Sequence, residues 1–325
     1  MADASAYDHI MTSPALRIGS RGSKLALRQA EELRTRLVAA HPELGASGAI
    51  ESVVIRTTGD RVTDRPLAEI GGKGLFIKEL EEALRDSRID LAIHSLKDMP
   101  AFLPDGFSIA AHLPREDARD ALIARGRAAS LRDLPRGASV GTSSPRRQAQ
   151  LLNLRPDLTI VPLRGNVDTR LAKIADGAAD ATVLALAGLK RLGRESEASA
   201  VLSAAEMLPA ATQGVIAVEI RDDDARMRTL LAAINHRQTA ICASAERALL
   251  ETINGDCGTP VAALATLDGN RIALDAMLLS PDGKTCHRLA RSTTTSRARE
   301  LGHEIGTALL EMAGPGFFGA AAGPA

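Results

Sequence analysis

The sequence predicts an α/β protein with two similar lobes and a smaller α+β third domain. Three observations support this fold class. Short apolar runs alternate with helical patterns over the first two thirds of the chain, the same order of motifs occurs twice, and the pattern changes after Val215. The chain has 325 residues, which is enough for two or three domains of about 100–200 residues each.

The predicted elements of the first two thirds fall into two sets. In the first set we expect strands over 16–19, 52–57 and 91–94, and helices over 23–40 and 73–85. In the second set we expect strands over 139–142, 159–163 and 181–186, with helices from Pro145 and over 167–175. Ser23 and Ser144 stand where a helix N-cap is expected, because a hydroxyl directly precedes each helical pattern.

The two sets resemble each other in sequence. "RIGSRGSKLALRQAE" is similar to "SVGTSSPRRQAQLLN", "VIRTTGDRVTDR" to "VPLRGNVDTR", and "RIDLAIHSLKD" to "AADATVLALAGLKR". Each match is weak, and the common pattern of α/β proteins can produce one by chance. Three matches in the same order favour two lobes built on one plan.

The last third has a different pattern. We expect helices over 221–234, 239–253 and 296–312, and strands over 261–266, 271–279 and 285–291. Asn254-Gly255 is typical of a left-handed helix end, and Asp268-Gly269 and Asp282-Gly283 are typical of hairpin turns. The predicted boundaries are 15–113 with 214–233 for the first lobe, 114–213 for the second, 234–313 for the C-terminal domain, and flexible tails over 1–14 and 314–325.

Composition excludes several classes of function. A net charge of zero, no Trp and a single Tyr argue against a nucleic-acid binder, which uses basic patches and aromatic platforms. Three cysteines without CxxC spacing fit neither a disulfide framework nor a zinc site, so we expect no metal and a reducing, cytoplasmic setting. No apolar run is long enough to span a membrane, and residues 1–14 lack the apolar core of a signal peptide.

Two arginines stand in the first turn of a predicted helix. Thr142 and Ser144 precede Pro145, and Arg146 and Arg147 follow it. The positive end of the helix dipole disfavours arginine there, yet a helix N-terminus is well suited to bind an anion. The pair therefore indicates an anion site, with a solvated helix start as the simpler alternative.

Other arginines lie near the ends of predicted strands. They are Arg21, Arg164, Arg170 and Arg191. Ligands of open α/β sheets bind beyond the carboxyl ends of the strands, and a guanidinium binds a carboxylate with two hydrogen bonds. Each arginine taken alone can be an ordinary surface residue, but their shared placement predicts a ligand with several carboxylates.

Asp98 and Cys257 are the candidate reactive groups. Asp98 ends the motif "HSLKD" after a buried strand, where neighbouring positive charge would hold it ionised and let it stabilise a cation. A turn aspartate is the alternative. Cys257 lies on the Gly-flanked loop "NGDCGTP", where a thiol is accessible, whereas Cys242 falls inside a predicted helix and Cys286 in a predicted strand.

These motifs together resemble those of the hydroxymethylbilane synthase family, also called porphobilinogen deaminase. The resemblance runs from about Leu16 to Met312 and rests on "LRIGSRGSKLAL", "GGKGLFIKELE", "DLAIHSLKDMP", "GTSSPRRQAQL", "LRGNVDTRL", "LAGLKRLG" and "NGDCGTP". It implies two periplasmic-binding-protein-like lobes that face a cleft. It also implies a monomeric transferase of tetrapyrrole and heme biosynthesis, which condenses four porphobilinogen molecules into hydroxymethylbilane and releases ammonia.

The resemblance also implies roles for individual residues. Asp98 is the catalytic carboxylate, and Cys257 carries a dipyrromethane primer through a thioether. The implied cofactor-binding residues are Ser23, Lys97, Thr142, Ser144, Arg146 and Arg147. The implied substrate-binding residues are Arg21, Lys73, Ser95, Arg164, Arg170 and Arg191, with Gln213 as a weaker candidate.

Two departures from the family pattern and one alternative function remain open. Asp256 stands where relatives often have Gly, and Glu69 where some have Lys. We expect both to change rates rather than function. The alternative function is a non-catalytic two-lobed anion-binding protein, against which the missing signal peptide and the third domain weigh.

Overall fold

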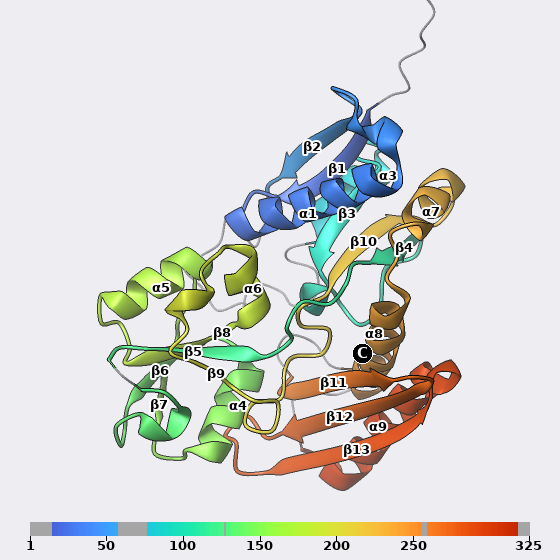
Figure 1. Cartoon of the computed structure of the whole chain (residues 1–325). Coiled ribbons are helices and arrows are strands. Elements are labelled where there is room, and N and C mark those ends of the chain that lie inside the picture. The colour runs from blue at the N-terminus through green and yellow to red at the C-terminus, as the bar shows by residue number, and fades with distance from the viewer. Residues whose placement is uncertain (1–14, 58–76, 127, 255–258, 318–325) are drawn as a thin grey trace, which may run out of the picture.

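The computed structural model describes residues 15–57, 77–126, 128–254 and 259–317. These residues form two five-stranded sheets and one three-stranded sheet (Figure 1). The first sheet is at the upper right of Figure 1, the second is at the left, and the three-stranded sheet is at the lower right. This arrangement confirms the predicted fold class of two α/β lobes and a smaller α+β unit, while the exact domain boundaries stay a prediction.

The first sheet has the order β2-β1-β3-β10-β4. Its strands are β1 (Leu16–Arg21), β2 (Ile50–Ile55), β3 (Leu91–Ser95), β4 (Phe107–His112) and β10 (Ile216–Arg221). Its helices are α1 (Lys24–Ala40), α3 (Lys78–Arg85) and α7 (Ala225–Ala232). β1 pairs in parallel with β2 and β3, whereas β10 runs antiparallel to both of its neighbours. We call this sheet and its helices the first lobe.

The second sheet repeats this topology in the order β7-β6-β8-β5-β9. Its strands are β5 (Asp120–Ala124), β6 (Ser139–Gly141), β7 (Thr159–Val161), β8 (Ala181–Ala185) and β9 (Ala200–Val201). Its helices are α4 (Pro145–Leu154), α5 (Val167–Ala175) and α6 (Leu186–Arg191). β6 pairs in parallel with β7 and β8, and β5 lies antiparallel to β8. We call this unit the second lobe, and its likeness to the first supports the predicted common plan.

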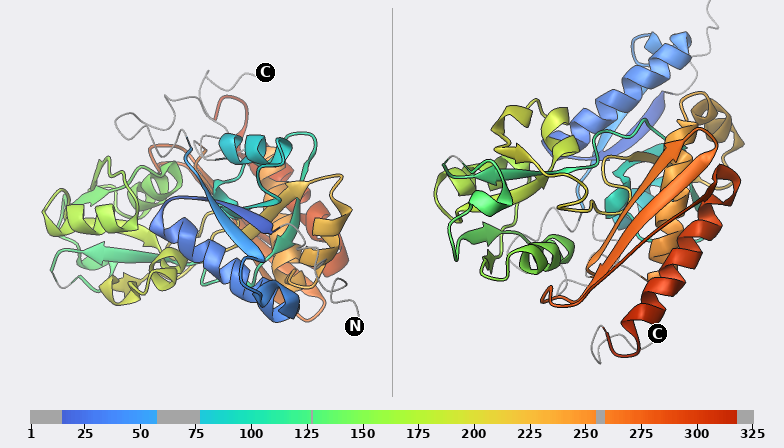
Figure 2. Two further views of the ribbon diagram at one scale, coloured as in Figure 1. Left: turned by 90° about the horizontal axis from the view of Figure 1, so that it is seen from above. Right: turned by 60° about the horizontal axis from the view of Figure 1, so that its bottom comes forward.

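The third sheet has the order β11-β12-β13 and is antiparallel throughout. Its elements are β11 (Val261–Asp268), β12 (Arg271–Leu279), β13 (Cys286–Thr294), α8 (Arg237–Ile253) and α9 (Ala298–Ala313). The two helices lie side by side against one face of the sheet (Figure 2). Leu249, Leu274 and Ile305 are fully buried between the helices and the sheet. Gly302 permits this close approach, because an added Cβ would lie 2.2 Å from the Ala245 carbonyl oxygen.

Local sequence signals located most helices correctly. Ser23 and Ser144 accept hydrogen bonds from backbone N–H groups as N-caps of α1 and α4. Asn254 ends α8 in the left-handed conformation, with φ of 51°. Gly269 and Gly283 also have positive φ at the predicted hairpin turns. These features depend on neighbouring residues alone, which is why sequence reasoning found them.

The sequence prediction missed four strands, β4, β5, β9 and β10, and the helix α6, and it placed the start of another helix wrongly. The helix expected over 221–234 covers only Ala225–Ala232, because Arg221 is the last residue of β10. β10 carries the fully buried Glu219. A charged residue at that position breaks the apolar pattern of a buried strand. The helix expected over 73–85 is seen from Lys78 onward, and residues 58–76 are outside the described residues.

Two chain segments connect the lobes, and they contact each other. The Glu116 N–H donates to the Gly214 carbonyl at 3.2 Å, and the Arg115 Nε donates to the Gln213 carbonyl at 2.9 Å. Gly214 has φ of 89°, and an added Cβ would lie 2.3 Å from the Glu116 carbonyl oxygen. The sequence predicts hinge motion between the lobes at Leu113–Pro114 and Gln213–Val215. No helix among the described residues is both long and apolar enough to cross a membrane.

Candidate functional site

Asp98 lies at the end of a strand, as the sequence predicts. β3 passes into a short 3₁₀ turn, η3 (Leu96–Asp98), and the Asp98 side chain is exposed there. Asp98 lines a small pocket together with Arg21, Ser23 and Ser95. All four predicted residues therefore meet beyond the carboxyl ends of β1 and β3.

The predicted hydroxyl residues already have structural partners. Ser23 caps α1, and Ser144 caps α4. The Thr142 hydroxyl accepts from the Ser144 N–H at 3.1 Å, and the Ser95 hydroxyl accepts from Gln29 Nε2 at 2.8 Å. Their oxygens can accept more than one hydrogen bond, so these contacts position the hydroxyls without excluding a ligand.

Arg146 and Arg147 are buried, and they share one carboxylate. Arg146 donates to Asp120 Oδ2 at 2.7 Å, and Arg147 donates to Asp120 Oδ1 at 2.8 Å. Arg146 also donates to the Leu208 carbonyl at 2.7 Å. The unfavourable position of two arginines at a helix N-terminus is therefore offset inside the protein by Asp120, which sequence reasoning did not identify.

The charge of this cluster shifts the pKa of its members. Burial alone would raise the pKa of Asp120, yet the charges and hydrogen bonds of Arg146 and Arg147 hold it well below its usual range. Burial lowers the pKa of Arg146. Asp120 therefore stays ionised, and the two guanidiniums together with this one carboxylate leave an excess of positive charge.

Lys97 connects this cluster to Asp98. Its Nζ donates to Gln213 Oε1 at 3.2 Å, and Gln213 Nε2 donates to Asp120 Oδ1 at 3.0 Å. Burial lowers the pKa of Lys97 to about 8, and the neighbouring charge of Asp98 acts in the opposite direction. Gln213, a weak candidate from sequence, thus lies between the two lobes and links their charged groups.

Arg164 and Arg170 bring more positive charge toward Asp98. Burial, together with the charges of Arg147 and Arg164, lowers the pKa of Arg170 to about 10, and the charge of Asp98 acts in the opposite direction. These groups are therefore within electrostatic reach of Arg170. The Arg170 Nε donates to the Gly165 carbonyl at 2.7 Å. Among the described residues, Arg164 Nη1 is buried without a hydrogen-bond partner.

Arg191 contacts the first lobe directly. Its Nε is 3.2 Å from Glu32 Oε2, and its Nη2 donates to the Gly214 carbonyl at 3.0 Å. A carboxylate ligand would therefore compete with Glu32 for this guanidinium. Arg191 bridges the lobes here, which adds a structural contact to the binding role predicted from sequence.

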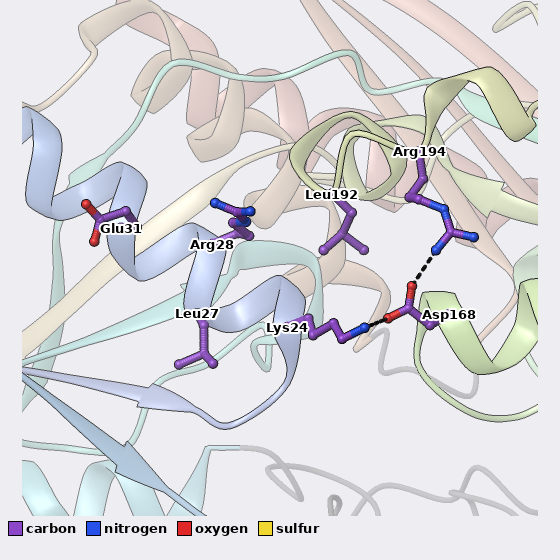
Figure 3. A pocket seen from close by; sticks show the side chains of 7 residues that line it. All are labelled: Lys24, Leu27, Arg28, Glu31, Asp168, Leu192 and Arg194. Atoms are coloured by element: carbon purple, nitrogen blue, oxygen red, sulfur yellow. Dashed lines mark hydrogen bonds and ion pairs between the residues drawn. The ribbon is translucent and has the colours of Figure 1, made fainter.

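A second pocket, of about 440 Å³, lies between α1, α5 and the residues that follow α6 (Figure 3). Lys24 is 2.9 Å from Asp168 Oδ2, and Arg194 is 2.7 Å from Asp168 Oδ1. Figure 3 shows Asp168 between these two cations, and the ion pair of Lys24 with Asp168 joins the two lobes. Sequence reasoning predicted no site here, and the pocket contains none of the predicted residues.

Cys257 and Lys73 are outside the described residues, as are Asp256 and Glu69. Residues 255–258 follow α8 and precede β11, which agrees with the predicted position of Cys257 between a helix and a strand. Burial raises the pKa of Cys242 to about 11 and also raises that of Cys286. Neither thiol forms a reactive thiolate easily. No metal-binding cluster of His, Cys, Asp or Glu occurs in the described part of the chain.

Asp120 and Gln29 contact predicted site residues, but sequence reasoning missed both. Asp120 stands in "REDARDAL", a charged stretch typical of a loop, and its partners are 26 and 27 residues away. Gln29 lies on α1 and is buried against Ser95. No local pattern marks either residue, because only the fold brings their partners close.

Two family profiles cover almost the whole chain. "Porphobilinogen deaminase, dipyromethane cofactor binding domain" matches residues 16–229, and "Porphobilinogen deaminase, C-terminal domain" matches residues 240–311. The chloroplastic porphobilinogen deaminase of Oryza sativa subsp. japonica is 49% identical over 93% of this chain and 85% of its own length. The chloroplastic enzyme of Pisum sativum is 48% identical over 93% of this chain and 83% of its own length.

Solved structures with distant similarity include two periplasmic proteins. The VFT2 domain of BvgS from Bordetella pertussis is 14% identical and has a TM-score of 0.40, with 68% of this chain and 86% of that domain covered. The sulfonate-binding protein SsuA from Methylobacillus flagellatus is 18% identical and has a TM-score of 0.38, with 74% of this chain and 68% of that chain covered.

The assignment rests on the family profiles and the two plant relatives. They cover the segments that contain Asp98, Arg147 and Cys257, and they do not favour a non-catalytic binding protein. The chain belongs to the porphobilinogen deaminase family, transferases that use a dipyrromethane cofactor to condense four porphobilinogen molecules into hydroxymethylbilane.

Proposed function

We propose that Asp98 is the catalytic carboxylate and that the arginines around it bind the carboxylates of cofactor and substrate. The convergence of cationic groups from both lobes on Asp98 carries this proposal. Lys97 adjoins Asp98 and interacts electrostatically with it and with Arg147. Arg170 likewise interacts electrostatically with Asp98 and Arg147. Each porphobilinogen unit brings two carboxylates, so a growing chain needs several guanidiniums.

The donors available in this cluster fit a dipyrromethane. Arg146 Nε, Arg147 Nε and Arg164 Nη1 are buried and have no partner within the described residues. Buried donors without partners are costly, and a ligand carboxylate would satisfy them. We propose that a thioether to Cys257 holds the cofactor, because a thioether resists the hydrolysis that would release an ester.

Asp98 has two tasks in each condensation. Porphobilinogen loses ammonia, its remaining electrophilic carbon forms a C–C bond with a free pyrrole α-carbon, and that α-carbon then loses a proton. Asp98 stabilises the positive charge that develops on the pyrrole nitrogen and accepts the released proton. When bound, the dipyrromethane supplies the α-carbon for the first addition. After four additions, water releases hydroxymethylbilane.

The Asp98→Asn variant tests this role. We expect a folded protein that keeps its primer but turns over roughly 10²–10⁴-fold more slowly, because a neutral amide neither stabilises the cation nor accepts the proton. Asp105→Asn is the matched control, since Asp105 is an exposed carboxylate a few residues further along the chain. Turnover of Asp98→Asn at the wild-type rate would overturn the assignment.

Intact-mass measurement tests the tether. Protein from a cell that makes porphobilinogen should carry the added mass of the primer, and Cys257→Ser should carry none. An unmodified Cys257 in the wild-type chain would contradict the attachment. We further propose a monomer in the cytoplasm, with sedimentation and fractionation as the tests; the rice and pea relatives are named chloroplastic.

A further inference from the structure

We propose that Asp120 is a positioning residue that holds Arg146 and Arg147 in the orientation needed to receive ligand carboxylates. The inference rests on the proposed function of these two arginines as cofactor-binding residues. It assigns a role to a buried acid that never contacts the reacting atoms.

Both carboxylate oxygens of Asp120 accept hydrogen bonds from other side chains. Its side chain has no solvent exposure. One oxygen accepts from Arg146, and the other accepts from Arg147 and from Gln213 Nε2. The carboxylate therefore fixes two guanidiniums relative to each other with charge-assisted hydrogen bonds, which are the strongest available to such groups.

The fold itself does not require an acid at this position. Asp120 is the first residue of β5 and pairs with Ala185 of β8. In the first lobe, Ile216 of β10 pairs with Ser95 of β3 at the equivalent place in the sheet. One lobe thus places a buried isoleucine where the other places a buried aspartate, and burying a charge is costly. A role in orienting Arg146 and Arg147 explains why the second lobe keeps a buried charge despite the free energy that its burial costs.

Arg146 and Arg147 each keep one N–H donor that Asp120 does not bind. The Nε atoms of Arg146 and Arg147 are buried and have no hydrogen-bond partner in the described chain. Asp120 binds terminal nitrogens of each guanidinium and leaves these donors unused. The pair is therefore held through its terminal nitrogens, while one buried donor on each guanidinium has no partner among the described residues.

Hydrogen bonds also connect Asp120 to η3, the turn that carries Lys97 and Asp98. Gln213 donates to Asp120 and accepts from Lys97 Nζ, so one hydrogen-bonded path leads from the arginines to the residue beside Asp98. Displacement of Asp120 would disturb both ends of this path. We therefore expect primer loading to be the first step to fail when Asp120 changes.

The experiment measures primer loading on protein produced without porphobilinogen. Porphobilinogen is added, and intact mass follows the modification of Cys257 with time. Asp120→Ala should load at least about tenfold more slowly than wild type, because small displacements of binding groups have large effects on rate. Formate should restore part of that rate by occupying the space between the arginines, and formamide should not.

Asp120→Glu separates position from charge. It keeps the negative charge, so we expect it to fold, but its carboxylate lies one methylene further out. Slow loading by Asp120→Glu supports positioning, whereas loading at the wild-type rate overturns it and leaves a role in charge balance alone. This variant keeps the test decisive if Asp120→Ala does not fold.

The matched control is Asp117→Asn, which removes an aspartate that pairs with Arg119 just before β5. It should load within about twofold of wild type, since exposed ion pairs contribute little. Equal rescue by formate and formamide would also overturn the proposal. If the wild-type chain itself takes up no primer, the proposed function fails instead, so the two failures are distinguishable.

Discussion

The two lobes share one sheet topology but present different groups at equivalent strand ends. β3 leads into η3, which carries Lys97 and Asp98, whereas β8 leads directly into α6. By strand register, Ala187 and Gly188 occupy the places of Lys97 and Asp98. The first lobe thus supplies the acid, and the second supplies the buried arginine pair. Two lobes with the same sheet topology can therefore carry different functional groups, because only a few residues at the strand ends need to differ.

The interiors of the two sheets also differ. In the first lobe, His94 Nε2 is 2.9 Å from Glu219 Oε2, and both side chains are buried. Strand register places Leu184 and Ile123 at the equivalent positions of the second lobe. Burial and the charge of Glu219 raise the pKa of the nearby Glu81 to about 7. The first lobe therefore contains a polar interior that the common topology does not need.

The largest effect should come from making the first lobe resemble the second. We expect Glu219→Ile alone to lower the free energy of unfolding by about 3–5 kcal/mol, because it leaves His94 buried without its partner. The double variant His94→Leu/Glu219→Ile should recover most of that loss. Urea denaturation measures both variants. A double variant as unstable as the single one would show that the two interiors are not interchangeable.

A smaller effect should come from Lys97, which has only Ala187 as its counterpart. Lys97 has a pKa of about 8, so it loses its positive charge as the pH rises above that value. We expect kcat/KM to fall on this alkaline side. Arginine keeps its charge throughout this range, so Lys97→Arg should move the fall to higher pH by about one unit or more. Superimposable pH profiles of the two proteins would contradict this role.

The smallest effect should come from the exposed contact between the lobes. Lys24→Met removes an ion pair with Asp168, while Arg194 keeps its own contact with that carboxylate. We expect a loss below about 1 kcal/mol in the free energy of unfolding, and less in 1 M salt, because solvent screens exposed charges. Denaturation at two salt concentrations measures this. A loss as large as that of Glu219→Ile would mean that the lobes depend on this contact.

Sequence reasoning succeeded where neighbouring residues decide the structure. The caps at Ser23 and Ser144 and the left-handed end at Asn254 follow from local chemistry. The catalytic role of Asp98 stays a prediction from the family motifs. Sequence reasoning failed where distant residues decide. β5 begins with the buried Asp120, and β10 contains the buried Glu219. The partners of both acids lie far along the chain. A charged residue beside or within an apolar run suggests a loop until its partner is known.

The antiparallel strand β10 also constrains how the protein can be made. β5 to β9 all lie within residues 120–201, so the second sheet has all of its strands before the first does. β3 and β4 become connected only when β10, at residues 216–221, is placed between them. On a ribosome, the lobe that begins first is therefore completed last. A chain truncated at residue 213 would keep a complete second sheet but leave the first divided.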